Sequence, residues 1–365
     1  MKSLKLLGAW VFTVSGCIAF ARFVRRGVFK KNYIGILAYH HISAQSPGPV
    51  SPVATSPGVF SDQVKKLTRI FQTFLMKDVS GFLHGEKRLV HDGLILTFDD
   101  GYEDAFLNAA PLLEAHGIYG VFYVTAVPFS GRLYLWNDIV GEALNSLGTQ
   151  NLDDLDFGPQ EFRKLLKKIA ARTGTKKKHF IQQAFNFLLD EEQIDRDKIS
   201  ILLNTVLKKN KAVLGPDRTL MNREQIVDLA RRGHEIGAHT LTHARLSKSG
   251  ENAKKEIIDS IRILREKGIP VSSFAYPFGH ETDIDFSCID TLKLAGISNA
   301  VTMEENIVAQ SSDVYLLPRI PVSPHHGASF IMAKFEFLAW RRLVWSWLHS
   351  RNPMKMSEQA LYKVA

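Results

Sequence analysis

Cysteine is nearly absent from this chain of 365 residues, which contains only Cys17 and Cys288. Two cysteines exclude the disulfide framework of a small secreted scaffold, and they leave the redox compartment open. With 45% hydrophobic and 23% charged residues, the composition fits an ordinary globular protein of one or two domains. The chain is long enough to bury a sizeable core.

A long hydrophobic run is missing too. The uncharged segment 6–21 is short for a membrane-spanning helix, which needs about 20 apolar residues. It suits a secretory signal better, and residues 14–17 (VSGC) resemble a lipoprotein cleavage box, but the apolar residues after Cys17 favour an uncleaved anchor. We expect residues 1–31 to be an N-terminal anchor or signal segment that associates the protein with a membrane.

The charges around segment 6–21 bear on the side of that membrane. Basic residues flank the segment at both ends, and more of them follow it than precede it. The positive-inside rule would then place the main domain on the cytoplasmic face, but the two counts are close. A periplasmic or extracellular main domain stays open as the alternative.

The other end of the chain, residues 328–365, forms an amphipathic tail. Arginines are interspersed among apolar side chains that recur at helical spacing, namely Phe337, Trp340, Val344, Trp347 and Leu348. Tryptophan beside arginine is typical of a helix lying in a membrane interface. A terminal helix packed on the main domain explains the pattern equally well.

Acidic residues are outnumbered, which leaves a formal net charge of +9. Such an excess can serve nucleic acid, anionic lipid or an acidic substrate. No module of interleaved basic and aromatic residues stands out, and lysine clusters such as 176–178 are explained by solvated helix ends. We therefore expect no nucleic-acid partner.

Between the two ends, strand-like and helix-like segments alternate. This alternation predicts an α/β fold around a parallel sheet, open or closed into a barrel. Strands are expected at 34–39, 94–98, 119–125, 234–239, 272–276, 299–303 and 315–322. Other expected elements are a loop over 43–58, a helix from Ser61 to Phe74 capped by Ser61, a helix opened by Pro111 and closed by Gly117, and helices near 222–233 and 252–267.

Residues from about 138 to 215 break the alternation. They are lysine-rich and helical in period, and they contain no cluster of ligand-type residues. We expect a helical insertion within the main domain, residues 32–327. Its expected role is a substrate lid or a partner surface rather than catalysis.

Two adjacent aspartates end the apolar strand in "LILTFDDG". Unpaired carboxylates are costly inside a hydrophobic layer, so Asp99 and Asp100 are expected at the carboxyl end of the strand, where sites are built in α/β sheets and barrels. Adjacent carboxylates also repel each other unless a cation or a shared proton relieves them. The pair therefore predicts a metal site.

The segment "HEIGAHTLTH" supplies further ligand-type residues. His239 and His243 lie four residues apart where a strand leads into a loop, within reach of one ion. Imidazole and carboxylate ligands suit Zn²⁺, with three protein ligands and one open position in a catalytic site, although other first-row divalent ions are possible. A lone pair of histidines is weak support, but the combination with the strand-terminal aspartates is strong.

These motifs carry a family resemblance. "TFDDG" and "HTLTH" resemble the first two motifs of the polysaccharide deacetylase, or NodB-homology, family of carbohydrate esterases. The resemblance covers roughly residues 34–322 and implies a distorted (β/α) barrel that removes N- or O-acetyl groups from glycans. It further implies that Asp99 is the general base and that Asp100, His239 and His243 hold a divalent metal.

The family's third motif is altered in this chain. "FAYPFG" shares only Pro277 and Gly279 with the usual motif, and Ala275 replaces the arginine that orients the base. Arg319 in "LPRIPV" could supply that cation from another strand, or it could form an ordinary ion pair. Because the oxyanion contact comes from the backbone, the segment Tyr276, Pro277 and Phe278 can still supply it.

The late histidine that carries the general acid in most members is absent. The segment "AYHHI" resembles instead the permuted subclass related to poly-N-acetylglucosamine deacetylases, in which the acid comes from the first strand. This resemblance implies that His40 is the general acid, since imidazole titrates near neutral pH. Alternative candidates are His41, His325 and His326.

The resemblance and the apolar ends together imply a membrane-associated, metal-dependent hydrolase. Its expected reaction removes an acetyl group from an amino sugar of a polysaccharide or a lipid-linked glycan. The alternative is a catalytically silent glycan-binding or scaffold protein of the same fold. The presence of Asp99 beside three metal ligands argues against it, because a silent protein has no need for a base.

Overall fold

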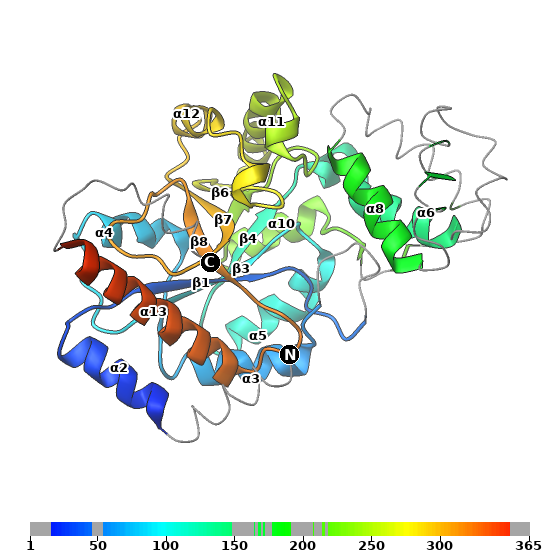
Figure 1. Ribbon diagram of the computed structural model, residues 1–365. Coiled ribbons are helices and arrows are strands. Elements are labelled where there is room, and N and C mark those ends of the chain that lie inside the picture. The colour runs from blue at the N-terminus through cyan, green and yellow to red at the C-terminus, as the bar shows by residue number, and fades with distance from the viewer. Residues whose placement is uncertain are drawn as a thin grey trace.

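The computed structural model describes residues 16–45, 54–147, 164, 167–168, 171, 177–190, 207, 214–215 and 218–350. Within them, parallel strands form a closed barrel surrounded by helices (Figure 1). Strand β1 pairs with both β3 and β8, so the order β1-β8-β7-β6-β5-β4-β3 returns to its start. The barrel strands are β1 Ile34–Tyr39, β3 Gly93–Phe98, β4 Val121–Val124, β5 Glu235–Ala238, β6 Ser273–Ala275, β7 Asn299–Glu305 and β8 Leu317–Pro321, and β2 Gln72–Thr73 adds a short strand beside β3.

The strands are apolar on both faces, because one face lines the barrel interior and the other supports the helices. All six positions of β1 and of β3 are buried. Ile36 and Ile95 belong to the interior cluster, whereas Leu37 and Leu96 belong to the larger cluster formed with the helices. The prediction of an α/β barrel is therefore confirmed, and parallel closure brings the carboxyl ends of all strands to one mouth.

Helices cover the outside of the barrel and extend one side of its mouth (Figure 1). The described α-helices are α2 Cys17–Gly27, α3 Pro57–Leu67, α4 Val79–Leu83, α5 Ala110–Glu114, α6 Trp136–Leu147, α8 Lys177–Asp190, α10 Arg223–Arg231, α11 Asn252–Glu266, α12 Cys288–Leu294 and α13 Ala328–Ser350. Helix α10 shows the predicted capping box, in which Asn222 and Gln225 exchange hydrogen bonds of 2.9 and 2.8 Å.

Two predicted helix starts are wrong. Helix α3 begins at Pro57, with Ser56 rather than Ser61 as its cap; the Ser56 hydroxyl accepts a hydrogen bond from Val59 N–H at 3.4 Å. Proline suits the first helical position because that residue needs no N–H donor, so the helix starts inside the segment predicted as a loop. The second helix begins as a π-helical turn at Ala105 and reaches Pro111 only within α5.

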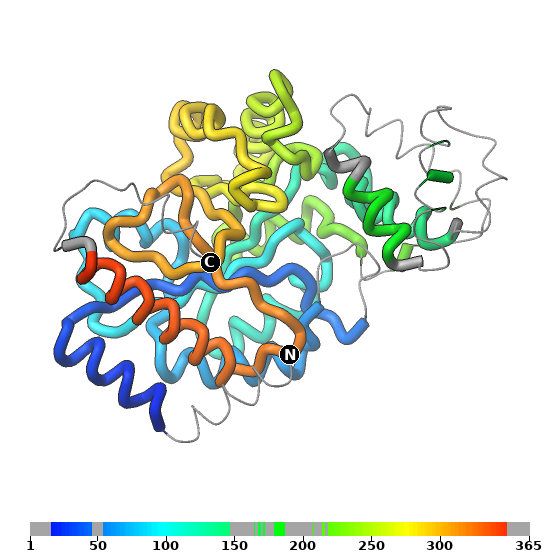
Figure 2. The backbone as a smooth tube through the Cα atoms, viewed as in Figure 1, coloured from blue at the N-terminus to red at the C-terminus, as the bar shows by residue number. Residues whose placement is uncertain are grey.

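The two ends of the described chain lie side by side. Helix α2 packs along α13, as the blue and red segments of Figure 2 show. Phe335, Leu338 and Ala339 of α13 are buried against the barrel, so α13 is a packed terminal helix, one of the two predicted alternatives. Among the described residues, no helix is both long and apolar enough to cross a membrane.

The predicted insertion lies partly outside the described residues. Its described helices, α6 and α8, pack against each other, and the rings of Trp136 and Phe185 stack with centroids 5.8 Å apart. The indole N–H of Trp136 donates to the carbonyl oxygen of His243 at 3.2 Å. The insertion is thereby connected to the loop that carries the predicted metal ligands.

Candidate metal centre and active site

Asp99 lies just beyond the carboxyl end of β3, and Arg319 of β8 holds it in place. The guanidinium donates two hydrogen bonds to the two carboxylate oxygens, at 2.7 and 2.6 Å. Both side chains are almost fully buried. Burial alone would raise the pKa of Asp99, but Arg319 outweighs it and lowers the pKa, so Asp99 is ionised at neutral pH.

Arg319 therefore lies where the missing third-motif arginine would have to act, beside the proposed base. It also donates to the carbonyl oxygen of Thr302 at 2.7 Å and to the hydroxyl of Thr97 at 3.2 Å. A bidentate arginine holds a carboxylate in one orientation. Of the alternative, an ordinary surface or core-edge ion pair, the surface form does not describe a guanidinium with no exposed area.

Asp100 points to the two predicted histidines. Its Oδ1 atom lies 3.2 Å from Nε2 of His239 and 3.1 Å from Nε2 of His243. Burial would raise the pKa of Asp100, but His243 and His239 overcome this effect and hold the pKa well below its usual range. Asp100 and His243 adopt left-handed backbone conformations, with φ of 73° and 61°, and such strain in non-glycine residues is concentrated at functional sites.

The chemistry of these three residues fits a divalent metal. The ligand atoms of Asp100, His239 and His243 all lie within 4.8 Å of one another. Both carboxylate oxygens of Asp100 are buried, and neither accepts a hydrogen bond. His239 Nδ1 lies 2.7 Å from the carbonyl oxygen of Ala275, which makes Nδ1 a donor and leaves Nε2, on the side of Asp100, as the nitrogen that would ligate a metal.

The separations support the same conclusion. Ligands about 2.0–2.1 Å from one tetrahedral Zn²⁺ lie roughly 3.3 Å from each other. The observed separations from Oδ1 to the two imidazole nitrogens are 3.2 and 3.1 Å. The two separations from Asp100 are therefore compatible with shared ligation of one divalent ion.

The altered third motif borders the same site. Tyr276 N–H donates to Val301 O at 3.2 Å, and its hydroxyl donates to Tyr315 O, also at 3.2 Å, so neither group is available. Pro277 has no N–H. Among the described hydrogen bonds, none uses the N–H of Phe278, which makes this amide the candidate oxyanion donor of the three.

The loop geometry depends on Gly279, which has φ of 73°. A Cβ atom at this position would lie 2.9 Å from Met303 N. Phe278 also has a positive φ, of 61°, and its ring lies 4.9 Å from that of His243. Phe278 therefore packs against the His243 imidazole, and a side chain at position 279 would clash with the backbone of Met303.

His40 alone among the four candidate histidines lines the pocket at the barrel mouth. His41 is buried, with Nδ1 2.8 Å from Asp104 and its ring stacked on Tyr102. His326 accepts a hydrogen bond from Ser323 N–H at 3.0 Å, and His325 is exposed. Burial lowers the pKa of His40 even though Asp100 and Asp99 act to raise it.

The pocket encloses about 200 Å³, and two of its lining residues come from the insertion: Asn137 of α6 and Phe185 of α8. Asn137 is 3% exposed, and its Oδ1 atom has no hydrogen-bond partner. Sequence analysis missed both residues, since nothing in the helical period of the insertion shows which side chains turn toward a distant barrel. Both metal-site histidines, His40 and Asp99 line the same pocket.

Comparison with known proteins agrees with this geometry. Residues 183–298 match the family model described as polysaccharide deacetylase; the matched region contains His239 and His243 but begins after Asp99 and Asp100 in the sequence. The predicted resemblance to the polysaccharide deacetylases is confirmed. No curated protein matches the chain in sequence.

Solved structures show that the deacetylase-like fold extends beyond the matched region. The Streptococcus pyogenes deacetylase PplD has a TM-score of 0.54 and 16% identity, with 83% of this chain and 98% of that chain covered. For the de-N-acetylase from Aggregatibacter actinomycetemcomitans the TM-score is 0.52 and the identity 14%, with coverage of 83% and 100%. IcaB from Ammonifex degensii has a TM-score of 0.50 and 16% identity, with coverage of 83% and 96%.

These comparisons support the prediction that the protein is a carbohydrate deacetylase. At such low identity the solved structures show the barrel fold alone, and the match to the polysaccharide deacetylase model is limited to residues 183–298. The pairing of β1 with both β3 and β8 puts the strand that bears His40 next to the strand that bears the aspartates, as the permuted subclass requires.

Proposed function

We propose that this protein is a metal-dependent hydrolase that removes an N-acetyl, or alternatively an O-acetyl, group from an amino sugar of a polysaccharide or lipid-linked glycan. The observation that carries the proposal is one pocket in which a buried, ionised carboxylate, Asp99, lies beside three side chains that could hold one metal ion. Asp99 is adjacent to the ligands but is not one of them; because Arg319 rather than the metal holds its carboxylate, Asp99 is free to act as a base.

Asp100, His239 and His243 would hold the metal. Bound there, a divalent ion supplies Lewis-acid activation of water and of the acetyl carbonyl. The carbonyl contact of His239 Nδ1 keeps that imidazole in the ligating tautomer.

Asp99 takes the proton of the attacking water in this proposal. Arg319 occupies one lone pair on each carboxylate oxygen and leaves others for the water. The amide N–H of Phe278 stabilises the negative charge that develops on the carbonyl oxygen. His40 then delivers a proton to the amine, which can depart only once it is protonated.

The insertion forms one wall of the substrate site in this proposal. Phe185 presents an apolar ring, and the unpartnered Oδ1 of Asn137 can accept a hydrogen bond from an N–H or O–H of the sugar. A buried polar atom without a partner is costly unless a ligand satisfies it. This argument supports the predicted role of the insertion as a substrate lid.

The decisive experiment measures release of free amine from acetylated glucosamine oligomers and from a lipid-linked acetylated sugar. We expect release that a chelator abolishes and that added Zn²⁺ or another first-row divalent ion restores. Asp99→Asn should retain the metal and lose activity by at least about a thousandfold. Release that is insensitive to chelation, or undiminished in Asp99→Asn, would contradict the proposal.

A further inference from the structure

Helices α2 and α13 expose an unusual number of large apolar side chains. Phe20 and Phe23 of α2 are 69% and 70% exposed, and Phe337 of α13 is 66% exposed. We define the terminal-helix face by these three residues together with Val344, Trp347 and Leu348, which are also exposed. The other exposed large apolar residues of the described chain are scattered over several elements.

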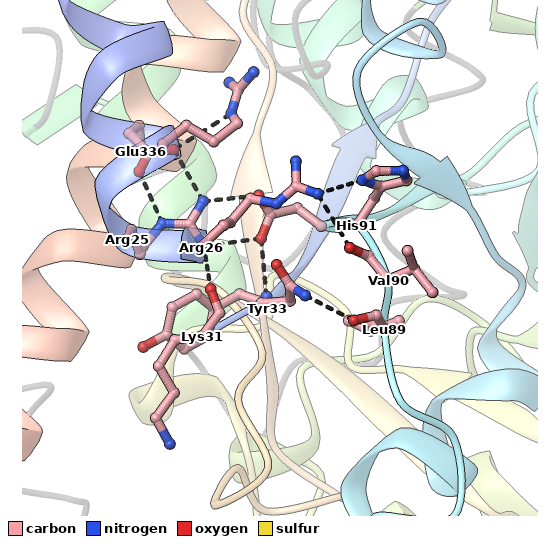
Figure 3. A network of polar contacts seen from close by, with 11 residues as sticks. Arg25, Arg26, Lys31, Tyr33, Leu89, Val90, His91 and Glu336 are labelled. Carbon is pink, nitrogen blue, oxygen red and sulfur yellow. Dashed lines mark hydrogen bonds and ion pairs between the residues drawn. The ribbon is translucent and has the colours of Figure 1, made fainter. Parts of the chain in front are cut away.

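The face belongs to two helices that are joined by a buried ion network (Figure 3). Arg25 of α2 has no exposed side-chain area, and it donates to Glu336 of α13 at 2.8 and 3.0 Å and to Asp92 at 2.9 and 2.7 Å. Its remaining N–H donates to the carbonyl oxygen of Lys31 at 2.7 Å. All five N–H groups of the guanidinium are thereby satisfied.

This network makes α2 a fixed part of the fold. Asp92 immediately precedes β3, so Arg25 connects α2 both to α13 and to the barrel. Further along, the rings of Phe29 and Trp340 meet edge to face with centroids 5.7 Å apart. The exposed side chains of α2 and α13 therefore move as one surface with the barrel.

The charge that the two helices themselves expose is positive, although Glu305 of β7 lies beside α13 and pairs with Lys334 at 2.6 Å. The sequence of α2 contains no acidic residue, and that of α13 contains only Glu336, which is buried in the network. Lys30 and Lys31 are exposed beside α2, and Arg341 is half-buried on α13. Two copies of this face would bring like charges together, whereas an anionic bilayer would complement them.

The chain that leads into α2 is also apolar. Residues 6–15 carry no charge and connect directly to the helix that bears Phe20 and Phe23. A segment of this kind and an aromatic face flanked by arginine and lysine share one suitable environment, the boundary between lipid headgroups and acyl chains.

We infer that the terminal-helix face binds a lipid bilayer that contains anionic lipid, with its apolar side chains at the headgroup boundary and the barrel held against the membrane by the Arg25 network. This inference is independent of the proposed reaction. It differs from anchoring by the N-terminal segment alone, because it requires contact by α13. The two helices are distant in sequence: Arg25 and Glu336 are 311 residues apart.

The test places an environment-sensitive fluorophore on the face of the full-length protein. Val344→Cys in a Cys17→Ser background has one accessible thiol, since Cys288 is buried. With phosphatidylcholine–phosphatidylglycerol vesicles we expect a blue shift at position 344 and quenching by brominated lipid. The same label at Leu294→Cys, on the exposed surface of α12, should show neither effect. No response at position 344 would overturn the inference.

A second measurement uses matched substitutions and vesicle flotation. Phe23→Ser combined with Phe337→Ser and Trp347→Ser should weaken binding to the same vesicles roughly tenfold or more, because three large apolar groups no longer enter the boundary. The control, Ile258→Ser with Leu294→Ser, removes exposed apolar residues elsewhere and should bind like the wild type. Equal binding by both variants, or a lipid-free dimer that only the face variant disrupts, would contradict bilayer contact by this face.

Discussion

Aspartates and arginines meet at both ends of strand β3, but the hydrogen bonding is complete at one end and incomplete at the other. At the amino end, Asp92 meets Arg25, and every N–H of that guanidinium has an acceptor. At the carboxyl end, Asp99 meets Arg319, but the adjacent Asp100 is buried with two oxygens that accept no hydrogen bond. Both arginines are fully buried.

The difference separates stability from function along a single strand. A fully satisfied buried ion network fixes one arrangement of α2, α13 and the barrel. An unsatisfied buried carboxylate is costly unless it has a ligand to bind. Along β3, the unsatisfied carboxylate therefore lies at the mouth formed by the carboxyl ends of the strands, where barrel enzymes act, and the satisfied ion network lies at the opposite end.

The largest effect is expected at the carboxyl end of β3, where Asp100 lies. Asp100→Ala should abolish metal binding and lower kcat/KM by at least on the order of a thousandfold, because the metal contributes several kcal/mol to catalysis. The free energy of unfolding of the metal-free protein should fall by less than it does when Arg25 is replaced, because the substitution removes a buried carboxylate with its contacts to His239 and His243 but leaves no buried carboxylate without a cation. Metal analysis and chemical denaturation check the two parts; strong destabilisation would erase the contrast between the two ends.

The amino end of β3, where Arg25 meets Asp92, should respond in the opposite way: stability should change and catalysis should not. Arg25→Met leaves buried Asp92 without its cation and leaves Glu336 only Arg22, at 3.6 Å. It should lower the free energy of unfolding by about 3–5 kcal/mol, while kcat of the folded protein stays close to that of the wild type. Arg262→Met, which breaks exposed ion pairs on α11, should leave the free energy of unfolding close to that of the wild type, because solvent screens such pairs. A large fall in kcat for Arg25→Met would show that the two ends are not separable.

Replacing His40 tests whether different residues at the barrel mouth serve metal binding and proton transfer. His40→Gln should lower kcat on the order of a hundredfold, as loss of a general acid does, and should leave the metal content intact. His325→Gln, at an exposed position, serves as the control and should change neither quantity. Loss of metal in His40→Gln would make His40 a ligand instead of the acid.

The smallest effect is expected at the insertion. Asn137→Ala removes one hydrogen bond to substrate, worth about 1 kcal/mol, and should raise KM roughly fivefold with little change in kcat. Asn145→Ala on the same helix breaks a 3.2 Å bond to Glu142 and should leave KM unchanged. Steady-state kinetics on an acetylated oligosaccharide distinguish the two variants; equal KM values would remove the insertion from the substrate site.

Local pattern was sufficient to predict the seven barrel strands and the ends at which carboxylates and histidines lie, but not β2, which lies in the segment predicted as helix up to Phe74 although α3 ends at Leu67. Strand β1 has the predicted bounds, and the helix before β5 has its predicted cap. Helix starts were harder, because Ser56 and Ser61 are both acceptable caps and only the following Pro57 separates them. The π-helical turn after Asp100 has no pattern of its own.

The sequence alone determined the chemistry available to this protein: strand ends rich in carboxylate and imidazole, a basic surface and apolar termini. Only the tertiary structure decided which of these groups meet, because Arg319 and Asp99 are 220 residues apart, and Arg25 and Glu336 are 311 apart. Periodicity reports a residue's near neighbours, whereas barrel closure and helix packing choose its distant partners. For the same reason the roles of Arg25 and Asn137 became visible only in the folded chain.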